Sequence, residues 1–181
     1  EATMSAGVDI GRFRNTTEIY LVGLTTVGSY PLRLAISLDN VEFDDQMSVL
    51  AAALEKLPIQ TMQIDRTGLG QQLAEGMERR YPAKAIGVTF TNELKAYWAT
   101  EAKMLIQQRK TPLPVDRDLS YQIHSIKKIV SSGKKLVFDT AASEKHHAAR
   151  FWAWALALTA TRVQLLEPAD DELRKAFGWL S

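Results

Sequence analysis

The stretch "GVDIGRFRNTTEIYLVG", from Gly7 to Gly23, places an aspartate at the end of a short apolar segment. Residues 6–10 are typical of a buried strand, and residues 17–27, rich in Thr, Val, Ile and Leu, indicate a second strand. Asp9 is followed by a glycine and then by two arginines. A carboxylate in this position is either an ordinary turn residue or part of a polar site, and the rest of the chain has to distinguish the two.

The composition limits the class of protein. The 181 residues are enough for one domain with a substantial core, and 46% hydrophobic with 24% charged residues indicates a folded domain. The net charge is +1, so a polyanion would have to be held by a local basic patch. The chain has no cysteine, which excludes disulfides and thiolate metal sites. No apolar stretch reaches the roughly 20 residues of a membrane span, and we expect no membrane contact.

The order of the expected elements predicts an α/β fold. A third strand at 32–38 completes an antiparallel meander, after which helices alternate with strands. This order predicts an RNase H-like, mixed five-stranded sheet with helices on both faces, in which the first and fourth strands are neighbours. An extra β-hairpin precedes the last long helix. The further strands are expected at 59–65 and 84–90, the hairpin at 127–139, and the helices at 44–57, 67–81, 92–110, 116–126, 143–166 and 168–180.

Two aspartates end strands that this layout makes neighbours. Asp9 lies at or near the end of the first strand, and Asp65 ends the fourth, in "QID". Two converging carboxylates repel each other unless a cation or a shared proton compensates. Such hard oxygen ligands suit Mg²⁺ or Mn²⁺, and a pair of these ions can promote phosphodiester cleavage. The alternative is that Asp65 only caps the helix that follows it.

Five segments, taken in order, resemble a known family: "GVDIGRFRNTT", "QIDRTGLGQQLAEGMERRY", "VTFTNELK", "HSIKK" and "HHAARFWAWALA". They resemble the C-terminal nuclease domain of phage terminase large subunits, of the type found in Mu-like phages and prophages. The resemblance implies an RNase H-like endonuclease that uses two Mg²⁺ or Mn²⁺ ions to cut double-stranded DNA during genome packaging. An ATPase motor domain normally precedes this domain, and no G-x-x-x-x-G-K-[ST] motif occurs here, so we expect residues 1–181 to be the nuclease domain alone.

The resemblance assigns metal ligands residue by residue. Asp9 matches the first metal-binding carboxylate and Asp65 the second. The third is expected in an H-x-D-R-F-W pattern, which His147 and Arg150–Trp152 match, but Ala149 occupies the aspartate position. We therefore expect cleavage to be impaired, either by an introduced substitution, which we favour because the surrounding motif is intact, or in a natural chain that cuts poorly. Asn15, where relatives often carry an acidic residue, and His147 are possible accessory residues.

Basic residues near these motifs are candidate DNA contacts, although charges on a solvated surface would look the same. Lys95, in "TNELK", falls in a matched segment, but an exposed helix lysine is the safer interpretation. The remaining candidates flank Asp9 or lie at the bases of the predicted hairpin, and lysines there would give salt-dependent, sequence-independent affinity. These candidates are Arg12, Arg14, Lys127, Lys128, Lys134 and Lys135.

Other functions remain as alternatives. A non-cutting module that grips DNA in a packaging machine is compatible with Ala149. An actin-like ATPase would need a duplicated domain, for which 181 residues are too few. A dinucleotide site built on "GLG" lacks the complete G-x-G-x-x-G fingerprint. Besides double-stranded DNA, the family implies an ATPase domain in the same polypeptide, small terminase and portal proteins as partners, and the host cytoplasm as location.

Overall fold

A mixed five-stranded sheet forms the centre of the domain, as the order of strands and helices predicts. The computed structural model describes residues 3–11, 16–130, 136–139 and 148–163. The sheet order is β3-β2-β1-β4-β5, with β1 antiparallel to β2 and parallel to β4. The first and fourth strands are therefore neighbours. The strands are β1 (Thr3–Asp9), β2 (Thr17–Leu24), β3 (Leu32–Leu38), β4 (Ile59–Asp65) and β5 (Ala85–Val88).

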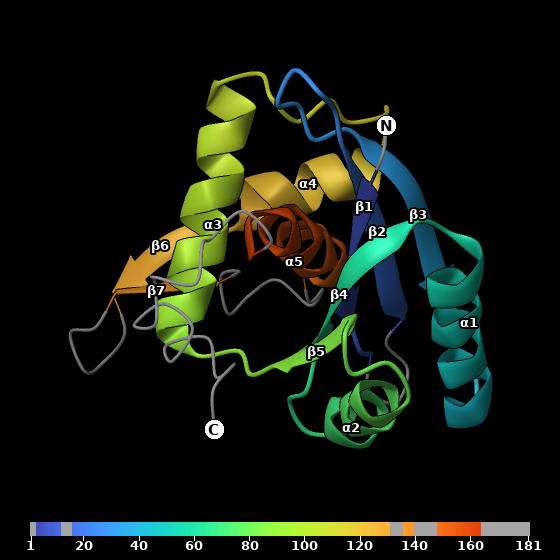
Figure 1. Ribbon diagram of the computed structural model, residues 1–181. Helices are drawn as coiled ribbons and strands as arrows, with labels where there is room; N and C mark the ends of the chain where they lie inside the picture. Colours follow the sequence, from blue (N-terminus) through green and yellow to red (C-terminus); the bar gives the residue numbers. More distant parts are fainter. Residues whose placement is uncertain (1–2, 12–15, 131–135, 140–147, 164–181) are drawn as a thin grey trace, which may run out of the picture.

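Helices cover both faces of the sheet (Figure 1). α1 and α2 pack on one face, over a core that includes Val8 and Ile64. α5 lies against the opposite face, with α3 and α4 packed around it, and the β6–β7 hairpin lies beside α3. The elements are α1 (Phe43–Lys56), α2 (Gly70–Arg80), α3 (Asn92–Gln107), α4 (Arg117–Ser125), β6 (Lys127–Val130), β7 (Leu136–Asp139) and α5 (Ala149–Val163).

Several predicted boundaries differ from the observed ones for local reasons. The strand expected at 17–27 ends at Leu24, because a turn with Gly28 at φ 71° begins there. The helix expected at 92–110 ends at Gln107, and Arg109 adopts the left-handed conformation with φ 56°. The helix expected at 143–166 begins at Ala149. Residues 143–147 and 164–166 and the predicted helix at 168–180 lie outside the described residues.

α5 is buried on all sides. Every residue from Phe151 to Thr161 is buried, including both Trp152 and Trp154. A helix that is apolar around its whole circumference needs neighbours in every direction, which explains its position between the sheet and α3 and α4. In the described part of the chain, no helix combines the length and apolarity needed to span a membrane.

Gly7 in β1 is a point of very close approach between the sheet and α5. A Cβ atom at Gly7 would lie 2.0 Å from the carbonyl oxygen of Ala153 and 2.4 Å from the amide nitrogen of Ala157. Both are backbone atoms, so no side-chain rotation would relieve the clash. Gly7 thus lets helix backbone lie directly on strand backbone.

We predict that Gly7→Ala destabilises the domain by about 3 kcal/mol or more, at the upper end of overpacking effects, because α5 must move away from the sheet. Gly76→Ala is the matched control. A Cβ at Gly76 would meet the terminal methyl of Met47 at 2.7 Å, and that flexible side chain can move. Urea unfolding of both variants provides the measurement. A Gly7→Ala variant as stable as Gly76→Ala would contradict the close-packing argument.

Candidate metal centre

Asp9 and Asp65 lie at the ends of neighbouring parallel strands, as predicted. They directly follow Val8 and Ile64, which are partners in the β1–β4 ladder. Val8 and Ile64 point into the core under α1 and α2. Because successive side chains alternate between the faces of a strand, the two aspartates are directed to the opposite face, where α5 lies.

Asp65 affects the ionisation of Asp9. Burial, the nearby charge of Asp65 and, to a smaller extent, the charge of Glu18 together raise the pKa of Asp9 from 3.8 to about 8. The positive charge of Lys95 acts in the opposite direction. Near neutral pH the site therefore holds a proton that a divalent cation could replace.

Asp65 also holds the turn that precedes α2. Its Oδ1 accepts a hydrogen bond of 2.8 Å from the Thr67 amide. The N-cap residue of α2 is Leu69, with no side-chain capping hydrogen bond, so the alternative that Asp65 only caps this helix is wrong. The helix expected from residue 67 begins at Gly70, after a turn in which Gly68 has φ 64°. A Cβ at Gly70 would lie 2.1 Å from the Asp65 carbonyl oxygen. Gly70 thus allows α2 to begin directly against the end of β4.

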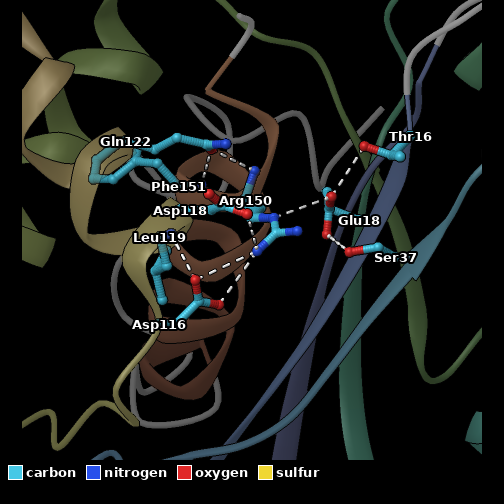
Figure 2. A network of polar contacts seen from close by, with 9 residues as sticks. All are labelled: Thr16, Glu18, Ser37, Asp116, Asp118, Leu119, Gln122, Arg150 and Phe151. Atoms are coloured by element: carbon cyan, nitrogen blue, oxygen red, sulfur yellow. Dashed lines mark hydrogen bonds and ion pairs between the residues drawn. The ribbon is translucent and has the colours of Figure 1, made fainter.

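Glu18 is a third carboxylate beside this pair, and the sequence analysis missed it. It is the ladder partner of Asp9 on β2, and only 2% of it is exposed. Its charge is compensated within the protein: Arg150 Nε lies 3.5 Å from Oε1, Ser37 donates to Oε2 at 2.6 Å, and Thr16 donates to Oε1 at 3.0 Å (Figure 2). An acidic residue directly before the apolar run "IYLV", within the same predicted strand, was the available signal, since a buried charge requires a partner.

Arg150 links three acidic residues from two elements (Figure 2). Besides Glu18, its Nη1 lies 3.3 Å from Asp116 Oδ2 and 3.3 Å from Asp118 Oδ2, at the start of α4. Burial alone would lower the pKa of Arg150, but Glu18, Tyr20 and these aspartates outweigh burial and raise it. Arg150 therefore stays charged and ties the first turn of α5 to β2 and α4.

Ala149 is the first residue of α5 and is half-buried. It precedes Ala153 by four residues, so both lie on the same face of the helix. Ala153 contacts β1 at Gly7, two residues before Asp9 on the same face of the strand. Arg150 contacts Glu18, the partner of Asp9, so the start of α5 lies toward the Asp9 end of β1. Position 149 thus faces the end of the sheet where Asp9 and Asp65 lie.

Lys95 also belongs to this region, and the expectation of an ordinary exposed lysine was wrong. It lies in the first turn of α3 and is half-buried. Its Nζ lies 5.2 Å from the centroid of the Trp152 ring, and its charge lowers the pKa of Asp9. Stacking on an aromatic face holds the ammonium near the carboxylates.

The structure describes only two of the other predicted basic residues. Lys127 and Lys128 lie exposed on β6. Arg12, Arg14, Asn15, Lys134, Lys135 and His147 lie outside the described residues. Their roles therefore stay predictions.

The donor set of the site is a pair of carboxylates. Across the described ranges, no group of three or more His, Asp or Glu side chains could hold a metal ion. Mg²⁺ in proteins commonly uses one or two carboxylates and keeps several water ligands, so Asp9 and Asp65 fit one such ion. Glu18 is already paired with Arg150, and the side chain of Ala149 offers no ligand atom.

Solved structures with the same fold include nuclease domains of phage large terminases. The large terminase nuclease from thermophilic phage G20c, solved with bound magnesium, gives a TM-score of 0.72 at 15% identity, covering 87% of this chain and 80% of that chain. The HK97 bacteriophage large terminase gives 0.66 at 10% identity, covering 88% of this chain and 40% of that one. The nuclease domain of the SPP1 large terminase, solved with Mn, gives 0.57 at 9% identity, covering 87% and 85%. No protein-family model and no curated protein sequence matches the chain.

We predict that the stability of the metal-free domain falls as pH rises, because folded Asp9 keeps its proton up to about pH 8, whereas unfolded Asp9 loses it near pH 4. The stabilising contribution is therefore full below pH 4 and lost as pH passes 8. Between pH 5 and pH 9, the unfolding free energy should fall by at least about 1.4 kcal/mol more in the chain as written than in Asp9→Asn.

Urea unfolding in EDTA at both pH values measures this difference. Asp44→Asn, at an exposed carboxylate in the first turn of α1, is the control and should keep the pH dependence of the chain as written. Equal pH dependence in Asp9→Asn and the chain as written would refute the raised pKa of Asp9.

Proposed function

We propose that this chain is the nuclease domain of a phage large terminase, of the type found in Mu-like phages, and that it is built to cleave double-stranded DNA with two Mg²⁺ or Mn²⁺ ions. In the chain as written, Ala149 occupies the position of the third carboxylate, so cleavage is weak or absent.

The observation that carries this proposal is the juxtaposition of Asp9 and Asp65 at one end of the β1–β4 pair, with the first turn of α5 facing them. These residues lie far apart in the sequence, and a fold does not require two partly buried carboxylates to meet. Their arrangement costs free energy unless a cation compensates. The magnesium and manganese bound in the G20c and SPP1 nucleases agree with this choice of ion.

The roles of the chain's own residues follow from their positions. Asp9 and Asp65 would hold the metal, and the hydrogen bond from Thr67 to Asp65 fixes the orientation of one carboxylate. When bound, the ions would supply an activated water molecule and neutralise charge on the leaving oxygen. Lys95, held over Trp152, would contact a DNA phosphate beside the carboxylates. Exposed Lys127 and Lys128 would add contacts that do not depend on DNA sequence.

A second candidate function is a module that grips DNA without cutting it. Ala149 favours this candidate for the chain as written, because residue 149 offers no oxygen to a second ion. The two candidates differ in one property, which is whether a carboxylate restored at position 149 produces metal-dependent cleavage.

The packaging setting is part of the same proposal. In it, an ATPase motor domain belongs to the same polypeptide, small terminase and portal proteins are the partners, and the host cytoplasm is the location. The chain covers only 40% of the HK97 large terminase, which agrees with a domain of a longer protein.

We predict that Ala149→Asp increases Mn²⁺-dependent cleavage of plasmid DNA by more than about tenfold, which corresponds to only about 1.4 kcal/mol of transition-state stabilisation. Agarose-gel assays of nicking and linearisation, with Mn²⁺ or with EDTA, measure the change. Ala149→Asn is the matched control, because it has nearly the same shape without the charge. Equal cleavage by the starting chain and Ala149→Asp would show that position 149 holds no catalytic carboxylate.

We predict that Lys95→Gln reduces the salt dependence of DNA binding. Loss of one phosphate contact lowers the slope of log K against log salt by about 0.9 in magnitude. Lys103→Gln, at an exposed lysine of the same helix, is the control and should change the slope by less than about 0.3. Fluorescence anisotropy with a labelled duplex in EDTA measures both. Equal changes in the two variants would mean that Lys95 contributes only to the general field.

A further inference from the structure

Position 149 lies where a helix is least constrained by its own backbone. The first four amide groups of an α-helix have no carbonyl partner within the helix, so the first turn frays unless other groups hold it. Ala149 is the first residue of α5. Of the residues just before it, the structure describes Ala148 but not 140–147. A ligand at this position needs an external support to stay aimed at Asp9 and Asp65.

Gln122 of α4 supplies one support. Its side-chain Oε1 accepts hydrogen bonds from the amides of Arg150, at 2.9 Å, and Phe151, at 3.2 Å (Figure 2). The acceptor that caps α5 therefore comes from another helix, and it holds the two residues that directly follow position 149.

The Arg150 side chain supplies a second support. Its guanidinium contacts Glu18 on β2 and both Asp116 and Asp118 of the α4 region. Glu18 is the ladder partner of Asp9, so this ion pair ties the first turn of α5 to the row of residues that contains the candidate metal ligand. Removal of the guanidinium would release that turn from β2.

We propose that Gln122 and Arg150 are positioning residues, which hold residue 149 in place over the Asp9–Asp65 pair so that a carboxylate at position 149 can complete the metal site. This inference rests on the proposed function, because it assumes that position 149 is the place of the third ligand. It differs from a purely structural role, in which the network only neutralises the buried Glu18.

A double-mutant cycle on Mn²⁺ affinity separates the two roles. Mn²⁺ dissociation constants are measured by electron paramagnetic resonance of free Mn²⁺ in four proteins: the chain as written, Ala149→Asp, Arg150→Gln, and the double variant. We expect Ala149→Asp to bind Mn²⁺ at least tenfold more tightly. Arg150→Gln should weaken binding roughly 10- to 100-fold in the Ala149→Asp protein, the usual effect of losing a group that orients a metal ligand. In the chain as written it should not weaken binding, because no ligand at 149 is left to position and the uncompensated charge of Glu18 beside Asp9 attracts the cation.

Further variants keep the test decisive. Arg150→Lys retains the charge and should restore part of the affinity in the Ala149→Asp background. Gln122→Ala leaves every ion pair intact and should weaken Mn²⁺ binding in that background alone, which decides the matter if circular dichroism shows that Arg150→Gln does not fold. Arg80→Gln removes a comparable ion pair with Glu55, 3.0 Å long and between α2 and α1, and should change neither protein.

The outcomes distinguish this proposal from the one on which it rests. If Ala149→Asp binds Mn²⁺ no better than the starting chain, the third-ligand position is wrong, and both proposals fall. If Ala149→Asp gains affinity but Arg150→Gln and Gln122→Ala weaken binding equally with and without Asp at 149, the nuclease proposal stands and the positioning role is refuted.

Discussion

The direct contact between the backbone of β1 and the backbone of α5 is the constraint on which the remaining architecture depends. Only glycine fits at position 7, because Ala153 and Ala157 already occupy the space of a Cβ atom. This close approach sets the distance between α5 and the sheet. Ala149 lies one helical turn before Ala153 and on the same face, so the first turn of α5 lies toward the end of β1. The site at that end is therefore defined by packing in the middle of the helix.

The acidic residues beside α5 show two ways of accommodating buried charge. Asp65, Asp9 and Glu18 lie in one row across β4, β1 and β2. Glu18 is paired with Arg150 and accepts hydrogen bonds from two hydroxyl groups, as a buried carboxylate requires. Asp9 instead has a pKa of about 8, because burial and Asp65 disfavour its charge. The first arrangement gives rigidity, and the second leaves a place that an external cation can fill.

Much of the fold was accessible from the sequence, because β-strand and helix periodicity and turn residues act locally. The strand at 59–65 and the place of Asp65 at its end were predicted correctly, and the RNase H-like order made Asp9 its neighbour. The Glu18–Arg150 pair was missed because its members are 132 positions apart and neither spacing nor composition links them. Lys95 was misjudged because periodicity cannot show that Trp152 lies under its ammonium. Residues brought together by tertiary packing thus remain the part that local patterns do not encode.

The central position of α5 has a consequence for the order in which the domain assembles during synthesis. Within this domain, β1, β2, β3 and β4 are synthesised before α5, the helix of residues 149–163 that fills one face of the sheet. Until α5 is synthesised, the sheet carries an apolar, uncovered face. The pair of aspartates can form before the helix that covers it, so the two halves of the site are joined only after α5 has packed.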